Sequence, residues 1–346
     1  MKTIKIQAID TLFFRAGKPF SMGEETSIET KLIPSPTVFW GAIFTRLLVD
    51  NKLQTHETDK LKIGRVFLCD EKNHRFLLPA PADLFIDKDK NIYTEKYQEV
   101  KELFVSSNIS ATYIVTPDTE KDVKRIENSF IEIYSFAPYI SKFNNDITIF
   151  NLTEILVLEN KIGIKRDNST NITETGILYR IPMLRFKDNW SYLVEYEIEG
   201  EKQLENNGIL KLGGEGKTAQ FSNYEKPLLE ISKECVVEKE EFFKIYASSP
   251  LILKSYDFIS WLKLFKETLN SWELVSISNS TPISVGGWDL EKRKPKPMKK
   301  AMPAGSVFVF KNLDKPLNTK EIRKSFELIL NQTETKFGFN QFEILI

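Results

Sequence analysis

The 346-residue sequence predicts an α+β fold made of two tandem ferredoxin-like (RRM-like) domains, with a large insertion in the first. Two observations lead to this prediction. In the last 110 residues, patterns typical of strands and helices follow one another in the order β-α-β-β-α-β. The first part of the chain can be divided in the same way if residues 52–160 are set aside. The predicted domains are therefore 1–236, with the insertion at about 52–160, and 237–346.

The C-terminal domain has the clearer pattern. Strand formers dominate 241–253, 272–283, 302–311 and the closing segment 337–346. After the first of these strands, apolar residues recur at helical spacing, namely Phe258, Trp261, Leu262, Phe265 and Leu269. Asn318 and Glu321 have the spacing of a capping box. A second apolar helical face follows them, namely Ile322, Phe326, Ile329 and Leu330.

The N-terminal domain is predicted from weaker signals. Residues 2–14 alternate like a strand, and Ser35 precedes a helix that has Pro36 at its first position. The apolar face of this helix is Trp40, Ile43, Phe44 and Leu47, and we expect Gly41 to allow the close approach of another backbone. Residues 176–186 and 190–198 are expected to form a hairpin. A short polar helix and a strand after a glycine-rich loop would complete the domain, and the insertion is expected to be helical at 93–104 and 118–130.

Composition limits the class of protein. Hydrophobic residues make up 41% of the chain, enough for a packed core, and 48 Lys and Arg balance 48 Asp and Glu. A net charge of zero argues against a protein that coats nucleic acid with its whole surface, although it allows a local basic stripe. Cys69 and Cys235 do not suggest a disulfide framework. With no signal-peptide core and no apolar run long enough to span a membrane, we expect a cytoplasmic protein.

Standard signatures of enzymes are missing from the sequence. The two histidines, His56 and His74, lie in polar surroundings typical of solvated loops. No Cys/His cluster has metal-ligand spacing, and no GxSxG, Walker A or GxGxxG motif stands between a strand and a helix. We therefore expect no metal, no cofactor and no catalytic activity.

Two segments near the N-terminus are candidates for anion binding. In LFFRAGKPF, Arg15 and Lys18 flank a glycine-containing turn where a phosphate could bind. The alternative is a strand end with solvated charges. In LIPSPTVFWGA, the helix start at Ser35–Thr37 suits an anion because a helix N-terminus presents free N–H groups. Here the alternative is an ordinary capped core helix.

Two later segments are candidates for contacts with a nucleic-acid backbone. In LKLGGEGKTAQF, Gly213, Gly214 and Gly216 form a flexible loop next to Lys217, and the alternative is a plain glycine-rich hairpin. In STPISVGGWDLEKRKPKPMKKAMPAGS (280–306), Gly286, Gly287 and Trp288 precede six cations, namely Lys292, Arg293, Lys294, Lys296, Lys299 and Lys300. Two prolines keep this stretch extended, which suits single-stranded nucleic acid. The alternative is a solvated lysine-rich loop.

Together these motifs resemble those of a known family. Six motifs occur in the order found in the third subunit of the Cmr complex, namely LFFRAGKPF, PSPTVFWGA, LPAPADLF (78–85), KIGIKRDNSTNITETGILY (161–179), LGGEGKTAQF and VGGWDLEKRKPKPMKKAMPAGSVF. Residues 286–300 of the last motif are called the basic hairpin below. This complex is the type III-B CRISPR effector, and the subunit belongs to the RAMP superfamily. The resemblance covers residues 10–310, whereas 86–160 carries no family motif.

The resemblance implies a non-catalytic effector subunit of antiviral defence. Its partners would be the 5′ handle of the CRISPR RNA, the large polymerase/cyclase subunit and a neighbouring RAMP backbone subunit. The segments that would face RNA are the motif loops, namely Arg15 and Lys18, Ser35 and Thr37, Lys165 and Arg166, Gly213, Gly214, Gly216 and Lys217, Gly286, Gly287 and Trp288, and Lys294, Lys296 and Lys299.

Two alternatives remain open on the sequence. One is a metal-independent endoribonuclease of the RAMP type that processes CRISPR RNA precursors, for which His56 or His74 would have to act as general base. The other is an adaptor that contacts only protein, and its RNA affinity would not depend on the basic hairpin.

Overall fold

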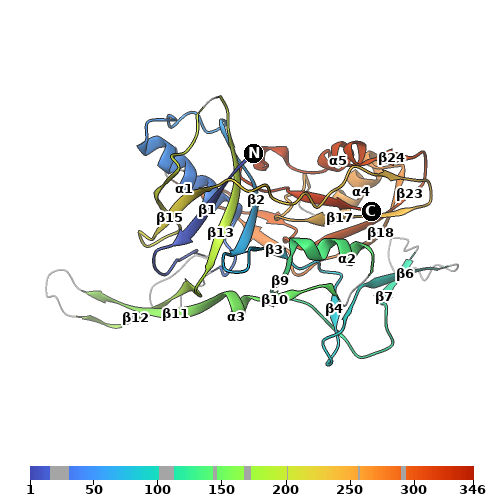
Figure 1. Ribbon diagram of the computed structural model, residues 1–346, viewed down its shortest axis with the longest axis horizontal. Coiled ribbons are helices and arrows are strands. Elements are labelled where there is room, and N and C mark those ends of the chain that lie inside the picture. Colours follow the sequence, from blue (N-terminus) through green and yellow to red (C-terminus); the bar gives the residue numbers. More distant parts are fainter. Residues whose placement is uncertain are drawn as a thin grey trace.

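The computed structural model describes residues 1–15, 31–100, 113–142, 146–166, 173–200, 202–255, 258–289 and 294–346. The chain is a mixed α/β structure rich in strands. Two antiparallel sheets lie side by side, one built mainly from the N-terminal half and the other from the last 110 residues (Figure 1). In the described part of the chain, no helix has the length and apolar character needed to cross a membrane.

The N-terminal sheet has eight strands, and all its neighbouring pairs are antiparallel. In spatial order they are β10 (Ile149–Asn151), β9 (Ser129–Glu132), β3 (Arg75–Pro79), β2 (Leu61–Asp70), β13 (Trp190–Ile198), β1 (Lys2–Ala8), β15 (Thr218–Tyr224) and β14 (Asn207–Lys211).

Helix α1 (Pro36–Val49) packs its apolar face against this sheet. The predicted stripe of Trp40, Ile43, Phe44 and Leu47 is buried, because apolar residues repeated at helical spacing form one face of a helix. The expectation for Gly41 was wrong, because a Cβ atom there would meet nothing within 4 Å.

The C-terminal sheet has the spatial order β18 (Trp272–Ser278), β23 (Val307–Asn312), β17 (Phe242–Ala247) and β25 (Phe342–Leu345), with all pairs antiparallel. Helix α4 (Phe258–Thr268) follows β17, and helix α5 (Thr319–Glu327) follows β23. The predicted β-α-β-β-α-β order of this segment is therefore confirmed for its main elements.

The core of this half is largely aromatic. Trp261 and Phe265 of α4 and Phe326 of α5 are buried together with Phe308 and Phe310 of β23. The predicted capping box is present, since Asn318 Oδ1 accepts a hydrogen bond of 2.9 Å from Glu321 N and Glu321 Oε2 accepts one of 3.1 Å from Asn318 N. Capping at this point fixes where α5 begins.

Smaller elements complete the chain. A long ribbon pairs β11 (Leu156–Arg166) with β12 (Thr173–Phe186), and a short hairpin pairs β6 (Glu95–Glu99) with β7 (Tyr113–Pro117); both leave the body of the molecule in Figure 1. The remaining strands are β4 (Phe85–Ile86), β5 (Ile92–Tyr93), β8 (Lys124–Arg125), β16 (Val236–Val237), β19 (Ile283–Val285), β20 (Trp288–Asp289), β21 (Lys294–Pro295), β22 (Lys299–Ala301) and β24 (Leu317–Asn318). The short helices are η1 (Ile133–Ser135), α2 (Phe136–Ile140), α3 (Leu152–Ile155) and η3 (Gln332–Glu334).

The region expected to be an insertion contributes strands to the main sheet. Strand β2 lies between β3 and β13 near the middle of the N-terminal sheet, although residues 52–160 did not fit the expected core pattern. The helices expected at 93–104 and 118–130 were also wrong for the described residues, which form β6, β8 and β9 instead. Alternating burial, as at Glu95 and Tyr97, favours a strand over a helix. The domain boundary at 236/237 stays a prediction.

Two further expectations for the N-terminal half were wrong. Residues 176–186 do not form a hairpin with 190–198, because β12 pairs with β11 over a register from Leu156–Phe186 to Ile164–Leu178, while β13 joins the main sheet. The longer register with β11 outweighs the short turn that suggested a local hairpin. The short polar helix expected after β13 is absent from the described residues, where β14 forms a hairpin with β15.

A buried ion pair joins the two sheets. The Asp83 side chain is 0% exposed and lies 2.6 Å from Lys244 Nζ of β17. The hydroxyl of Tyr139 donates to the same carboxylate, at 2.7 Å from Oδ1 and 2.8 Å from Oδ2. Lys244 Nζ also lies 4.4 Å from the centre of the Tyr139 ring, and burial together with Asp83 raises the pKa of Tyr139. The carboxylate is thus fully paired by groups from both halves.

Backbone contacts continue this seam. Tyr246 Oη donates to Pro79 O at 2.6 Å, and Ala82 N donates to Gly305 O at 2.8 Å. Gly305 has a φ of +90°, and a Cβ atom there would lie 2.6 Å from Ala80 O. Only glycine fits this position, where the backbones of the two halves approach each other closely.

The first prediction concerns the buried pair. Asp83→Ala should lower the free energy of unfolding by about 3 kcal/mol, because it leaves a largely buried ammonium and the Tyr139 hydroxyl without their partner. The figure is at the low end for a broken pair, since Lys244 is still 19% exposed and can recruit water. Chemical denaturation of the variant and of Asp118→Ala, an exposed control, provides the measurement. Equal midpoints for the two variants would contradict a structural role for the pair.

Candidate nucleic-acid interface

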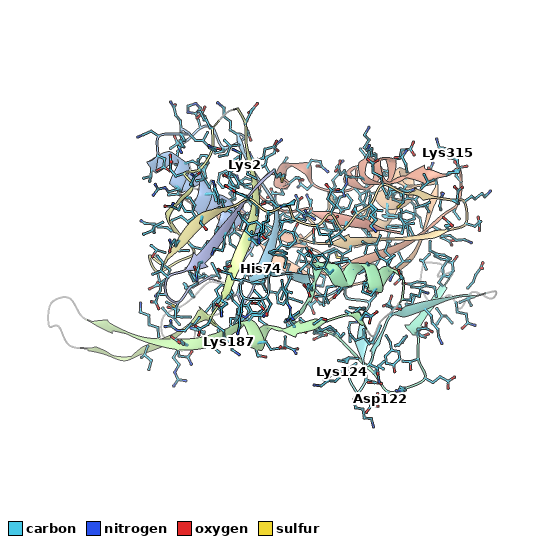
Figure 2. The ribbon with its side chains drawn as sticks, viewed as in Figure 1. Lys2, His74, Asp122, Lys124, Lys187 and Lys315 are labelled. Atoms are coloured by element: carbon cyan, nitrogen blue, oxygen red, sulfur yellow. The ribbon has the colours of Figure 1, made fainter. Side chains whose placement is uncertain are left out.

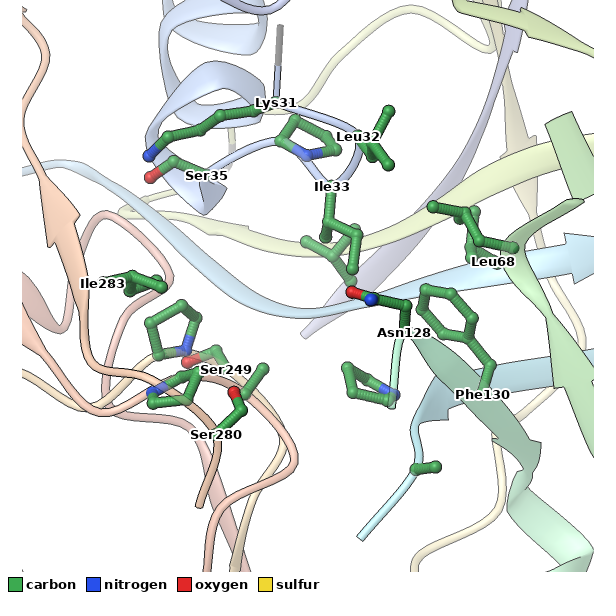
Figure 3. Close-up of a pocket in the computed structure, with 18 of the residues that line it drawn as sticks. Lys31, Leu32, Ile33, Ser35, Leu68, Asn128, Phe130, Ser249, Ser280 and Ile283 are labelled. Atoms are coloured by element: carbon green, nitrogen blue, oxygen red, sulfur yellow. The ribbon is translucent and has the colours of Figure 1, made fainter. Parts of the chain in front are cut away.

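A cleft of about 840 Å³ lies between the two halves of the molecule. One wall is residues 31–36 at the start of α1, and another is 125–130. The wall from the C-terminal half is made of 248–250, Ser280, 283–285, Met298 and 303–304. Figure 3 shows Lys31 and Ser35 beside each other, with Ser249, Ser280 and Ile283 on another side of the opening. The lining of the cleft is mainly apolar, but it also includes several serines and two cations, Lys31 and Arg125. The cleft therefore combines apolar surface with polar groups.

Lys31 joins three segments that are far apart in the sequence. Its backbone N–H donates to Phe14 O at 2.7 Å, so the strand end before Arg15 lies next to the start of α1. Its ammonium donates to Ser284 O at 3.3 Å, on the strand that leads into the basic hairpin. The structure therefore brings together parts of the first, second and fourth predicted binding segments, although Lys31 itself was not among the predicted residues.

The start of α1 offers fewer donors than its sequence suggests. Ser35 has the extended backbone of an N-cap, but its side chain makes no capping hydrogen bond. The Thr37 hydroxyl instead donates to Ser35 Oγ at 3.1 Å, and Val38 N donates to Ser35 O at 2.9 Å. Pro36 has no N–H. Recognition of an anion here would rest on the two hydroxyls and Lys31 more than on the helix backbone.

Arg125 is the second cation of the cleft, and the sequence analysis missed it. Its Nη1 donates to Asn279 O at 3.2 Å, and its Nη2 lies 3.5 Å from Glu95 Oε1. Burial raises the pKa of Glu95, against the hydrogen bonds from Ser278 and Ser276 and the charge of Arg125. Because 118–130 was expected to be a helix within an insertion, no signal in the sequence placed this guanidinium near the cleft.

Packing explains two of the glycines in the loop 213–217. Gly213 has a φ of +81°, and a Cβ atom there would lie 2.4 Å from Phe13 O. Gly214 donates its N–H to the same carbonyl at 2.8 Å, and a Cβ atom there would lie 2.9 Å from the Phe13 ring. At Gly216, by contrast, φ is +66° and the space around it is open. Gly213 and Gly214 thus serve the approach of two backbones, and Gly216 alone leaves room for a ligand.

The cations around this loop are paired with acids. Lys217 Nζ lies 3.0 Å from Asp10 Oδ2, and Arg185 lies 3.2 Å from Asp10 Oδ1 and also pairs with Glu159. The hydrogen bond from Lys217 is the main reason that the pKa of Asp10 lies below its usual value, so the carboxylate stays ionised at neutral pH. Lys217 is therefore already neutralised within the chain.

The basic hairpin is formed by β19 with β22 and by β20 with β21. Lys296 lies with its ammonium 4.2 Å from the centre of the Phe337 ring, and Lys299 pairs with Glu334. Lys294 and Lys300 are exposed and have no ionic partner among the residues that the structure describes. Two of the three predicted lysines are thus engaged internally, and Lys300 is free although it was not selected.

For several predicted residues the structure describes few contacts or only the backbone. Arg15 is exposed at the strand end, and Lys18 lies outside the described residues. For Lys165, Arg166 and Trp288 the structure describes the backbone, in β11 and β20, but not the side chains. Gly286 faces Met298, whose Sδ would lie 2.5 Å from a Cβ atom, and Gly287 O accepts from Lys296 N at 2.9 Å.

Both histidines are exposed in loops and neither lines the cleft. His74 lies in the turn between β2 and β3 (Figure 2), and His56 precedes β2. The described residues contain no group of three His, Cys, Asp or Glu side chains suited to a metal ion.

These features define a class of protein: a mixed α/β chain of two antiparallel sheets that enclose a cleft lined by cations and hydroxyl groups. The family model described as CRISPR-associated protein (Cas_Cmr3) matches residues 4–346. The chain therefore belongs to the Cmr3 family of CRISPR-associated proteins, which confirms the resemblance seen in its motifs.

Solved structures support the fold. A chain in the cryo-EM structure of the type III-B Cmr-beta bound to cognate target RNA matches with a TM-score of 0.59 at 17% identity, covering 99% of this chain and 96% of that chain. A chain in the same complex bound to cognate target RNA and AMPPnP, state 1, has the same TM-score and coverage at 16% identity. Among curated proteins, none matches the chain significantly.

The second prediction separates the two kinds of glycine. Gly213→Ala should lower the free energy of unfolding by about 3 kcal/mol, because positive φ and a clash with a backbone oxygen add together. Gly216→Ala should cost only about 1 kcal/mol, since it carries the φ penalty without a clash. Thermal denaturation of both variants distinguishes them, and a larger loss for Gly216→Ala would refute the packing explanation.

Proposed function

We propose that this protein is a non-catalytic RNA-binding subunit of a type III-B CRISPR effector, which holds the 5′ handle of the CRISPR RNA in the cleft between its two halves. In this proposal it also docks the large polymerase/cyclase subunit and a neighbouring RAMP backbone subunit. We interpret the two halves as ferredoxin-like units, and the strand order of the C-terminal sheet favours this interpretation for that half.

The observation that carries the proposal is the convergence around Lys31. Segments near residues 14, 35 and 284 were each selected from the sequence as candidate RNA contacts, and hydrogen bonds of Lys31 link the first and third across the start of α1. Three weak signals that meet at one cleft support a shared function more strongly than any of them alone.

The chemistry of the cleft suits single-stranded RNA. Single-stranded RNA is recognised through splayed bases that stack on planar or apolar surface and are read along their edges. Ile33 and Met298, which are 46% and 50% exposed, provide apolar surface, while Ser249 and Asn128 provide donors and acceptors. The rings of Phe39, Phe130 and Tyr192 lie beneath this lining and are at most 4% exposed. Ser248, which is 5% exposed, lines the same cleft, and its buried hydroxyl has no hydrogen-bond partner among the residues that the structure describes. A buried hydroxyl of this kind gains most from a ligand that satisfies it.

The rim of the cleft supplies positive charge for phosphates. Lys31 lies inside, and Lys294 and Lys300 extend from the hairpin that begins at the same wall, whereas Arg125 is paired with Glu95. Because few of these charges are needed to hold a short single strand, a protein of zero net charge remains compatible with RNA binding.

Exposed apolar side chains outside the cleft support protein contacts. Leu158 and Ile162 are exposed on β11, and Phe242 is exposed beside Tyr97 and Tyr113 of the β6–β7 hairpin. Exposed apolar groups on elements that protrude from the body are typical of interfaces in an assembly.

The third prediction tests the cations that the structure leaves free. Lys294→Ala with Lys300→Ala should flatten the log–log salt dependence of RNA affinity by about 1.4, that is about 0.7 for each phosphate that is no longer neutralised. Lys299→Ala should change it much less, since Glu334 already neutralises Lys299. The measurement is RNA affinity over a salt series. An unchanged slope in the double variant would show that RNA does not contact the basic hairpin.

The fourth prediction tests the absence of catalysis. Labelled repeat RNA should stay intact with the purified chain, with or without divalent metal, because neither histidine lines the cleft. Cleavage that disappears in His56→Ala or His74→Ala would favour the endoribonuclease instead.

A further inference from the structure

The acids around the predicted RNA contacts are placed as if to occupy cations. Glu334 pairs with Lys299, and Asp10 pairs with both Lys217 and Arg185. Each of these pairs joins segments far apart in the sequence. The chain as a whole has 48 cations and 48 acids. Near the predicted RNA contacts too, acids pair with cations that RNA phosphates would otherwise attract.

Glu334 is the best positioned of these acids. It ends the short helix η3, whose preceding residue Asn331 is held by a 2.9 Å hydrogen bond from Asn340 Nδ2 to Asn331 O. The Glu334 side chain is only 16% exposed, and that of Lys299 is 25% exposed. Three residues further on, Phe337 receives the Lys296 ammonium at 4.2 Å. The segment 334–337 therefore takes two lysines of the hairpin and leaves Lys294 and Lys300.

We propose that Glu334 attenuates RNA binding: it holds Lys299 in an internal ion pair and so removes one phosphate contact for RNA of any sequence. This inference rests on the proposed function. Contacts to phosphate carry no sequence information, and each of them strengthens binding to any RNA. An acid that occupies one cation removes such a contact for all sequences, while contacts made to bases in the cleft are unaffected. Affinity for correct and for unrelated RNA therefore falls by the same factor, and the ratio between them is unchanged.

The expected size of the effect follows from counterion release. Freeing Lys299 adds one phosphate contact, which makes the log–log salt slope steeper by about 0.7. At 0.1 M salt this corresponds to about fivefold tighter binding.

The fifth prediction is tested with Glu334→Gln, which keeps the shape of the side chain and removes its charge. Binding of uridine homopolymer and of repeat-derived RNA is measured over a salt series. We expect affinity for both RNAs to rise about fivefold at 0.1 M salt, with the steeper slope. Glu230→Gln is the matched control, because it changes net charge equally at an exposed residue with no ionic partner in the described part of the chain.

A double-mutant cycle identifies the cation involved. Lys299→Gln alone should leave the slope unchanged, and Lys299→Gln combined with Glu334→Gln should return the affinity to the wild-type value. If Glu334→Gln and Glu230→Gln act equally, only net charge matters and the inference is wrong. It is also wrong if Lys299→Gln alone flattens the slope by about 0.7, because the lysine would then already contact phosphate.

Failure of the proposed function has a different outcome. If the wild-type protein shows no salt-dependent RNA binding, and Lys294→Ala with Lys300→Ala changes nothing, the RNA-binding function itself is refuted along with the inference. If that double variant flattens the slope while Glu334→Gln has no effect, the function stands and only the inference fails.

Discussion

The buried carboxylate of Asp83 is the interaction on which the arrangement of the two halves depends. It accepts hydrogen bonds from Lys244 of the C-terminal sheet and from Tyr139 of α2, and its surroundings exclude water. Isolated charges are strongly disfavoured in such a setting, so the halves are held in the one arrangement that pairs them. The close approach at Gly305 adds a steric constraint, because no side chain fits between the backbones there. The cleft next to this seam takes its shape from both.

That shape matters because both halves contribute to the cleft. Its cations come from the residue stretch before α1 and from β8, and its serines come mostly from the C-terminal half. Since each half supplies only part of the lining, affinity for a ligand there is linked to the association of the halves. Internal ion pairs around the cleft divide the cations into those that are occupied, such as Lys217 and Lys299, and those that remain available, such as Lys294 and Lys300. The number of lysines in a segment therefore does not give the number of positive charges that a ligand can contact.

Local patterns predicted the parts of the fold that depend on local physics. The capping box at Asn318 and the apolar faces of α1 and α5 were visible because helical spacing and capping act within a few residues. Strand pairing was less predictable, since β12 selects β11 over β13 through a register that only the folded chain reveals. The candidate binding segments were recognised as sequence motifs, but the ion pairs that neutralise their lysines were not predicted. The partner of Lys299 is 35 residues away and that of Lys217 is 207 residues away, and no local pattern encodes either pair.

The β11–β12 ribbon is attached to the body near its base, where Leu12 and Leu184 exchange two backbone hydrogen bonds and Ile181 and Met183 pack on Phe13. An eleven-residue strand reaches ~36 Å, so the ribbon is a lever with a short fixed arm and a long outer one. Phe13 packs on the base of the ribbon with its side chain and accepts a hydrogen bond from Gly214 of the loop 213–217 with its carbonyl. The ribbon and that loop thus share one support, which lies far from the outer end of the ribbon.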